Sequence, residues 1–142
     1  MSQPLSDFPS HGLVASHVSV TDRAGHVIVD DVSVHAYPGR TLVIVGESGA
    51  GKSMLARTLC ALTPSALSAS GTVSLGGEDY DLATNQGRLK KQRGGGIVWL
   101  PQDPFTSLAP TIRCAKQVTA ARTGRRSERA QRSRALLAEV GL

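Results

Sequence analysis

The alternation of hydrophobic and polar residues predicts several short β-strands early in the chain. Residues 13–20 alternate with the period of a strand, and residues 27–34 continue as extended chain after a turn at residues 22–25. Residues 71–75 predict a further strand, which leads into Gly76-Gly77, a pair typical of hairpin turns.

The following segments combine apolar runs with helical periodicity. Residues 41–45 (Thr-Leu-Val-Ile-Val) predict a buried strand, and residues 54–59 open a helix that we expect to end near residue 62, before Pro64. Residues 82–93 predict a short polar helix, and residues 97–100 predict another buried strand. Residues 127–140 predict an amphipathic helix whose apolar side comprises Ala130, Leu136, Leu137 and Val140.

A glycine-rich loop lies between the predicted strand 41–45 and the helix that follows it. Its sequence is Gly46-Glu47-Ser48-Gly49-Ala50-Gly51-Lys52-Ser53, which fits the phosphate-loop pattern G-x-x-x-x-G-K-[ST] in full. The glycines let successive backbone N–H groups point at phosphate oxygens. The helix that starts near Gly51 adds the positive end of its dipole.

Two side chains of this loop complete the chemistry of a triphosphate site. Lys52 supplies a positive charge for the β- and γ-phosphates, and the Ser53 hydroxyl is a ligand for Mg²⁺. The sequence therefore predicts binding of a nucleoside triphosphate. The expected cofactor-binding residues are Gly46, Glu47, Ser48, Gly49, Ala50, Gly51, Lys52, Ser53 and Met54. A glycine-rich turn that merely precedes a helix is disfavoured, because strand, loop and helix are all in register.

Composition narrows the remaining classes of protein. With 142 residues, of which 40% are hydrophobic, the chain has enough apolar material for a core. Cys60 and Cys114 lie too far apart for a metal-type spacing and suit a reducing compartment. Residues 1–12 are polar and predict a loose leader without a secretion signal. No stretch approaches the ~18 apolar residues of a membrane span, so we expect no direct span.

The net charge of +5 raises the question of a nucleic-acid partner. The charge is concentrated in a cluster near the C-terminus, with no interleaved aromatic residues and with Glu128 and Glu139 breaking the run. We expect a solvated helical face there and no nucleic-acid partner. The cluster consists of Arg122, Arg125, Arg126, Arg129, Arg132 and Arg134.

A second motif, Pro-Gln-Asp-Pro-Phe-Thr-Ser-Leu-Ala-Pro, occupies residues 101–110. With it the chain resembles the ATP-binding subunits of ABC transporters, specifically the oligopeptide/dipeptide/nickel importer group. In that group a strand ends in Gln-Asp-Pro-x-x-Ser-Leu-x-Pro, the Q-loop. The resemblance extends from residue 13 onward and includes Pro38-Gly39-Arg40, the hairpin at residues 71–77 and the Gln117-Val118 start of the next helical region.

The resemblance implies an α/β fold of the P-loop NTPase type. It specifies an ABC-type nucleotide-binding domain with a small antiparallel β subdomain and the start of a helical subdomain, incomplete within 142 residues. Residues 13–142 would form the N-terminal part of this ATP-binding domain, and residues 1–12 its leader.

The resemblance also implies a function. The chain would be the ATP-binding component of an importer, coupling ATP binding and hydrolysis to uptake of peptides or nickel, with ATP and Mg²⁺ as cofactors. Its partners would be transmembrane permease subunits and a second ATP-binding subunit, and its place the cytoplasmic face of the cell membrane. Gln102 would be the catalytic residue of the Q-loop and a Mg²⁺ ligand together with Ser53, since a neutral amide oxygen can contact the metal or the attacking water.

The sequence departs from this family in three respects. The positions that would carry an adenine-stacking aromatic residue are Val20, Thr21 and Asp22, and His26 is the nearest substitute. The Leu-Ser-Gly-Gly-Gln signature and the Asp-Glu strand do not occur. No histidine matches the switch position, because His11, His17, His26 and His35 all precede the phosphate loop. Residues 27–31 resemble the apolar strand with acids in composition, but they precede the phosphate loop. We therefore expect an ordinary strand end and turn there.

The third departure concerns the sheet around residues 41–45. In the family, strands from beyond residue 142 flank this segment, so we expect it to expose an apolar face and to promote association. The missing motifs predict that the 142-residue chain binds Mg-ATP weakly and hydrolyses it negligibly.

Two alternatives remain open. One is a non-catalytic nucleotide-binding fragment, which is the family assignment applied literally to 142 residues. The other is a small P-loop kinase with the arginine cluster as its lid. The Q-loop segment and the long stretch ahead of the phosphate loop disfavour the kinase.

Overall fold

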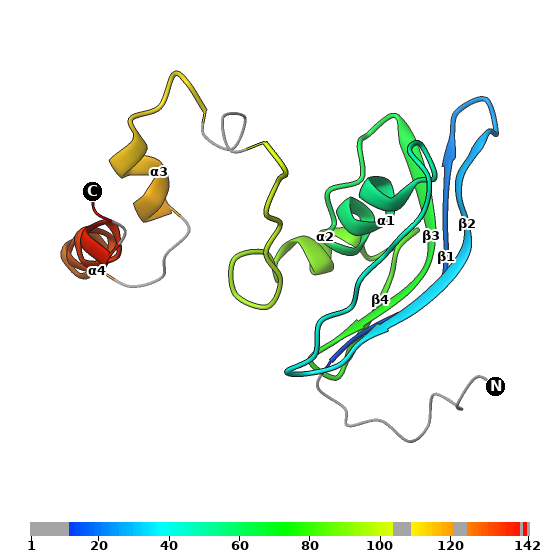
Figure 1. Ribbon diagram of the computed structural model, residues 1–142, viewed down its shortest axis with the longest axis horizontal. Helices are drawn as coiled ribbons and strands as arrows, with labels where there is room; N and C mark the ends of the chain where they lie inside the picture. The colour runs from blue at the N-terminus through cyan, green and yellow to red at the C-terminus, as the bar shows by residue number, and fades with distance from the viewer. Residues whose placement is uncertain (1–11, 104–108, 121–124, 140, 142) are drawn as a thin grey trace. The chain divides into compact units, whose positions relative to one another are not determined.

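The computed structural model describes residues 12–103, 109–120, 125–139 and 141, and it divides into two units, Met1–Val98 and Trp99–Leu142 (Figure 1). Each unit is described by itself. The first contains β1 (Leu13–Asp22), β2 (Val27–Ala36), α1 (Lys52–Leu59), β3 (Leu67–Leu75), β4 (Glu78–Asp81) and α2 (Gln86–Lys90). The second contains α3 (Cys114–Ala120) and α4 (Arg126–Glu139).

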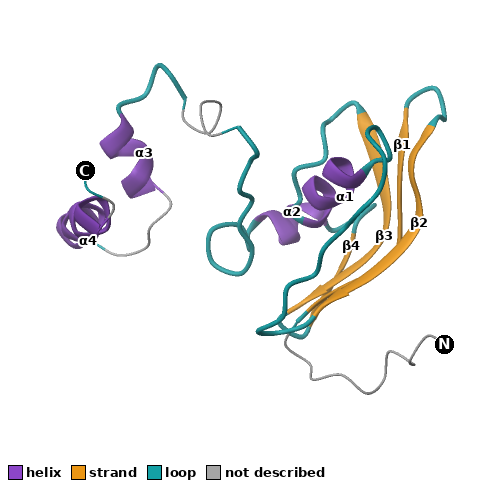
Figure 2. Cartoon of the chain, viewed as in Figure 1, coloured by secondary structure: helices purple, strands orange, loops and turns teal. Residues whose placement is uncertain are grey.

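The first unit is built on a four-stranded antiparallel sheet with the strand order β2-β1-β3-β4 (Figure 2). β1 lies in the interior of the sheet and pairs with β3 from Leu13↔Leu75 to Asp22↔Leu67. The hairpin predicted at Gly76-Gly77 connects β3 to β4. The strands expected early in the chain are therefore confirmed, as is the small antiparallel sheet.

The hydrophobic core lies between one face of this sheet and the helices α1 and α2 (Figure 1). Strand alternation directs Val18, Val20 and Val73 into the core, where each is fully buried. Burying an aliphatic side chain of this size contributes about 1.5–3 kcal/mol. The helices add Leu55, Leu59 and Leu89 to the same cluster.

The helices of the first unit are shorter than the sequence predicted. α1 ends at Leu59 because Ala61 takes a left-handed conformation (φ 54°), and the Leu62 N–H closes the turn by donating to the Arg57 carbonyl at 2.8 Å. α2 starts only at Gln86, because the preceding residues form a turn around the Asp81 carboxylate. That carboxylate accepts hydrogen bonds from Thr84, which hold the pKa of Asp81 below its usual value.

The strands expected at residues 41–45 and 97–100 are not formed, so these two predictions are wrong. An extended segment becomes a strand only when a neighbouring strand supplies hydrogen bonds. Within the described residues, the β-pairing in these segments is limited to an isolated bridge between Arg93 and Ile97. The expected exposure of the apolar segment is confirmed, since Val43 is 70% and Val45 84% exposed.

In the second unit, α3 and α4 contact each other. The Glu128 carboxylate accepts the Arg125 N–H at 3.3 Å and so caps the start of α4. The helix predicted at residues 127–140 is confirmed within one residue, although Val140 lies outside the described residues. Its expected apolar side is only partly correct: Ala130 and Leu137 are half-buried, whereas Leu136 is 39% exposed. Among the described helices, none is long and apolar enough to cross a membrane.

We predict that the exposed apolar segment at residues 41–45 drives self-association. Replacing Val43 and Val45 together by serine should lower the associated fraction measured by size exclusion with light scattering, because unpaired apolar segments template contacts between chains. Val27→Ser is the matched control, since Val27 is 57% exposed but lies in a paired strand. An equal effect of the control would contradict the prediction, and circular dichroism verifies that each variant is folded.

Candidate functional site

The predicted phosphate loop curls into the first turn of α1. The Ala50 N–H donates to the Glu47 carbonyl at 3.3 Å, and the Gly51 N–H donates to the Gly49 carbonyl at 2.8 Å. Gly49 and Gly51 take left-handed conformations, with φ of 84° and 78°. Such backbone is costly for a residue with a side chain, and it lets the loop turn tightly into the helix.

The N-terminus of α1 offers backbone donors that the helix itself does not use. Its first internal hydrogen bond runs from the Leu55 N–H to the Gly51 carbonyl at 2.8 Å. The N–H groups of Lys52, Ser53 and Met54 therefore have no acceptor within the helix. No side chain caps this end, and the first turn carries no acidic residue that would compete for an anion.

The Lys52 ammonium group bridges two backbone carbonyls of the loop. Its Nζ donates to the carbonyls of Gly46 at 2.8 Å and Glu47 at 2.5 Å. An ammonium group has three N–H donors, so these bonds hold the charge at the loop and leave one donor for an anion. The Ser53 side chain is exposed at the next position of α1, where its hydroxyl oxygen is a suitable Mg²⁺ ligand.

Gly51 also fixes the distance between the loop and the sheet. A Cβ atom at this position would lie 2.4 Å from the Ile28 carbonyl oxygen and 3.2 Å from Val29 Cγ2, both on β2. Beside this contact is a hollow of about 390 Å³. The hollow is lined mainly by apolar side chains of β2, residues 44–45 and α1, and its two charged residues are Lys52 and Asp30.

The strand end expected at residues 27–31 is not formed, because β2 continues to Ala36. The two acids in the middle of β2 do not act together. Asp30 lines the hollow, whereas Asp31 pairs with His17 at 2.7 Å on the exposed surface. Among the described residues, no group of three or more His, Cys, Asp or Glu is arranged to hold a metal ion.

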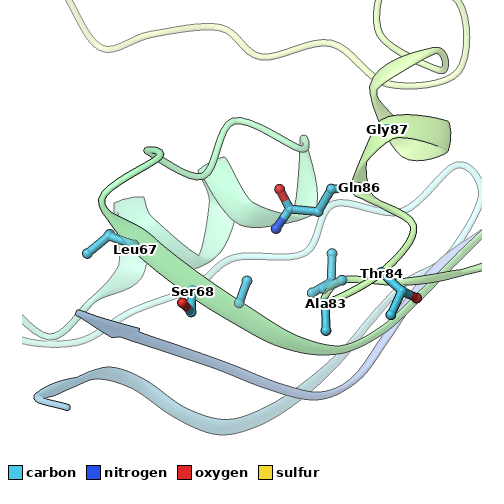
Figure 3. A pocket seen from close by; sticks show the side chains of 8 residues that line it. Leu67, Ser68, Ala83, Thr84, Gln86 and Gly87 are labelled. Atoms are coloured by element: carbon cyan, nitrogen blue, oxygen red, sulfur yellow. The ribbon is translucent and has the colours of Figure 1, made fainter. Parts of the chain in front are cut away.

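A second hollow of about 380 Å³ lies between the start of β3 and the β4–α2 connection (Figure 3). No motif in the sequence marks this hollow. Its polar side chains, Ser68, Thr84 and Gln86, are all uncharged, so it lacks the cation that a phosphate requires. The first hollow, in contrast, has a cation in its lining, Lys52. The second hollow is lined by Leu67, Ser68, Ala69, Leu82, Ala83, Thr84, Gln86 and Gly87.

The positions that would carry an adenine-stacking aromatic residue lie near the end of β1. Val20 is fully buried in the core and is not accessible to a base. The His26 ring is exposed, and its Nδ1 lies 2.8 Å from Asp22 Oδ2. This hydrogen bond holds the pKa of the Asp22 carboxyl below its usual value.

Gln102, the predicted Q-loop glutamine, belongs to the second unit and is exposed. Residues 104–108 of the predicted Q-loop lie outside the described residues. The described chain resumes at Ala109, where the Gln117 side chain makes three hydrogen bonds to the backbone. The sequence predicts Gln117 only as the start of a helical region, because its backbone contacts depend on a turn that no local pattern marks.

Comparison with known proteins decides the family. The sequence profile described as ABC transporter matches residues 29–142. The chain belongs to the ABC transporter family. The match includes the phosphate loop, Gln102 and both helices of the second unit, so the predicted fold class of a P-loop NTPase is confirmed.

Three relatives show the range of ABC transporter proteins to which the chain is similar. It is 39% identical to the dipeptide transport ATP-binding protein DppD of Lactococcus lactis over 72% of this chain and 30% of the relative. It is 36% identical to the peptidoglycan transport ATP-binding protein YejF of Agrobacterium fabrum over 84% of this chain and 23% of the relative. It is 31% identical to the metal-staphylopine import system ATP-binding protein CntD of Staphylococcus aureus over 75% of this chain and 39% of the relative.

In each case the matched region spans less than two fifths of the relative's length. All three relatives are named as ATP-binding proteins of transport systems, in agreement with the family resemblance seen in the sequence.

We predict that Gly51→Ala damages the loop more than Gly49→Ala. Both changes place a side chain at a positive φ, at a cost of about 1–2 kcal/mol each. Only at Gly51 would the Cβ also overlap β2, since the space around Gly49 is open within 4 Å. Urea unfolding should therefore show the larger loss of stability for Gly51→Ala, and equal losses would contradict the close contact with β2.

Proposed function

We propose that this chain is the ATP-binding part of an ABC importer and holds the phosphates of ATP in the loop formed by residues 46–53. The observation that carries the proposal is the placement of Lys52 beside unused backbone donors at the start of α1. Three peptide N–H groups, an ammonium and a helix dipole then act on the same anion. The apolar hollow alone would not select a phosphate.

Each loop residue has a proposed role. The backbone of Gly46, Glu47, Ser48, Gly49, Ala50 and Gly51 surrounds the phosphates, while the N–H groups of Lys52, Ser53 and Met54 bind their oxygens. The ammonium of Lys52 neutralises the β- and γ-phosphates, and Ser53 supplies an oxygen ligand to Mg²⁺. Bound Mg²⁺ would neutralise further phosphate charge. Gln102 is proposed as the catalytic residue that contacts Mg²⁺ or the attacking water.

The transport role is proposed from the relatives. Their names associate them with dipeptides, peptidoglycan and metal-staphylopine, which supports import of peptides, or of a metal, by the system that contains this chain. Permease subunits and a second ATP-binding subunit are the proposed partners, and the cytoplasmic face of the membrane is the proposed location. The family match over residues 29–142 disfavours the small P-loop kinase.

The first test of the proposal is Lys52→Ala. Removing the ammonium should weaken Mg-ATP binding by about tenfold or more, because a hydrogen bond to a charged group contributes about 1.5–3 kcal/mol. Isothermal titration calorimetry with the full chain measures the affinity. Lys90→Ala is the matched control, since Lys90 is an exposed lysine of α2. Equal affinity of Lys52→Ala and the unmodified chain would exclude the loop as the phosphate site.

The second test separates the metal from the nucleotide. Ser53→Ala should weaken ATP binding by about tenfold when Mg²⁺ is present and have little effect in EDTA, because only the metal-bound form uses the hydroxyl. Asp30→Asn serves as the comparison, because Asp30 lines the neighbouring hollow without a proposed metal role. If Asp30→Asn removed the Mg²⁺ dependence instead, the metal ligand would have been assigned to the wrong residue.

A further inference from the structure

β3 has a neighbouring strand on both sides only along its second half. β1 pairs with it from end to end, whereas β4 pairs only with Thr72–Leu75. The last backbone hydrogen bond on the β4 side runs from the Leu82 N–H to the Gly71 carbonyl at 2.9 Å. Within the part of the chain that the structure describes, residues 67–70 therefore form an open edge of the sheet.

The edge is open because β4 ends in a turn around Asp81. The Asp81 carboxylate accepts the N–H groups of Ala83 at 2.9 Å and Thr84 at 2.8 Å, and the Asp81 carbonyl accepts the Asn85 N–H at 2.7 Å. The chain thus turns into α2 instead of continuing along β3. The space left beside the open edge is the second hollow, and Figure 3 shows the Gln86 side chain over it.

The open edge lacks the charges that the outer strands of the sheet carry. β2 contains Asp30 and Asp31, and β4 has three acids in Glu78–Asp81. Charged side chains on an edge strand discourage the addition of another strand. Residues 67–70 are Leu-Ser-Ala-Ser, without charge or proline, and the polar side chains that line the hollow are also uncharged. An apolar strand can therefore be added here without burying a charge.

The chain also contains a strand-like segment without a partner. Residues 41–45 (Thr-Leu-Val-Ile-Val) are rich in β-branched residues. In the described structure their backbone makes no hydrogen bond to another backbone group. Val43 and Val45 are the most exposed hydrophobic side chains of the segment. Since they are two residues apart, a strand conformation would place both on the same face.

Within one chain, this segment does not reach the open edge. Ile44 and Val45 line the first hollow together with residues of β2. The strand order β2-β1-β3-β4 puts β1 and β3 between β2 and the open side of β3. A strand added on that side would lie three strand positions, or about 14 Å, from β2. The partner that the segment lacks must therefore come from a second copy of the chain.

We propose that residues 41–45 of one copy add as a strand to residues 67–70 of a second copy. The backbone of the added strand supplies hydrogen-bonding groups to the open edge, and its two exposed valines enter the hollow beside Leu67 and Ala69. The donor segment and the acceptor edge are different surfaces, so the contact can repeat from copy to copy. This inference goes beyond the proposed function and does not depend on it, because the contact needs no nucleotide.

The acceptor edge is tested with a peptide of residues 40–46, Arg-Thr-Leu-Val-Ile-Val-Gly. It is added to the full chain carrying Val43→Ser and Val45→Ser, whose own donor segment is disabled. When the peptide occupies about nine tenths of the chains, those amides of residues 68–70 that do not bond β1 should exchange about tenfold slower, because they exchange only from the free form.

The control peptide has serine at both valine positions and should give no protection. Absence of binding by the valine peptide, binding without protection of residues 68–70, or equal protection by both peptides would overturn the proposal.

The arrangement of the copies is tested by mixing two disabled chains. Val43→Ser/Val45→Ser lacks the donor, and Ser68→Lys/Ser70→Lys places charges on two exposed positions of the acceptor edge. Each chain alone should be monomeric by size exclusion with light scattering. An equimolar mixture should form a complex with the mass of two chains and nothing larger, because one donor and one acceptor remain.

Ser127→Lys/Gln131→Lys is the matched control for the added charge, since both residues are exposed on α4. It should associate as the unmodified chain does, and circular dichroism verifies that each variant is folded. Undiminished association of Ser68→Lys/Ser70→Lys would overturn the proposal, because the donor segments would then pair with each other. A mixture of the two disabled chains that stays monomeric would overturn it as well.

Discussion

The contact between Gly51 and β2 is the constraint on which the candidate site depends. The loop backbone approaches the Ile28 carbonyl so closely that only a hydrogen atom fits between them. Because β2 is held by β1 in the sheet, this approach gives the start of α1 a fixed position over the core. The direction of the α1 dipole and the place of Lys52 follow from it, so a packing constraint orients the electrostatics of the site.

The same region shows how local and tertiary requirements differ. α1 forms because its hydrogen bonds lie within the helix and its apolar face meets the core at Leu55 and Leu59. The apolar segment before it is at least as strand-like in sequence, yet it stays outside any strand and exposes Val43 and Val45. A helix satisfies its own backbone, whereas a strand depends on a neighbour. The phosphate loop is consequently supported on its helix side and by β2.

The two units differ in net charge as well as in secondary structure. Lysine and arginine balance aspartate and glutamate in residues 1–98, so the net charge of +5 resides in residues 99–142. In the first unit the proposed phosphate-binding cation, Lys52, donates to two carbonyls of its own loop. In the described part of the second unit, the neutral amide of Gln117 makes three hydrogen bonds to the backbone. A hydrogen bond between uncharged groups is little affected by pH or salt.

The sequence by itself determined the early strands, the hairpin at Gly76-Gly77 and the helix after Ser53, and it predicted the phosphate loop. These features rest on local rules: strand alternation, glycine conformation and the chemistry of Lys-Ser after a glycine turn. Only the tertiary structure decided that residues 41–45 and 97–100 form no strand, that α2 begins after a turn around Asp81, and that Leu136 faces outward. It also decided the contacts of Gly51 with β2 and of Gln117 with Ala109, which join residues that are distant along the chain or depend on a particular turn. Local patterns specify which structure a segment can adopt, and its neighbours in space determine which one it does adopt.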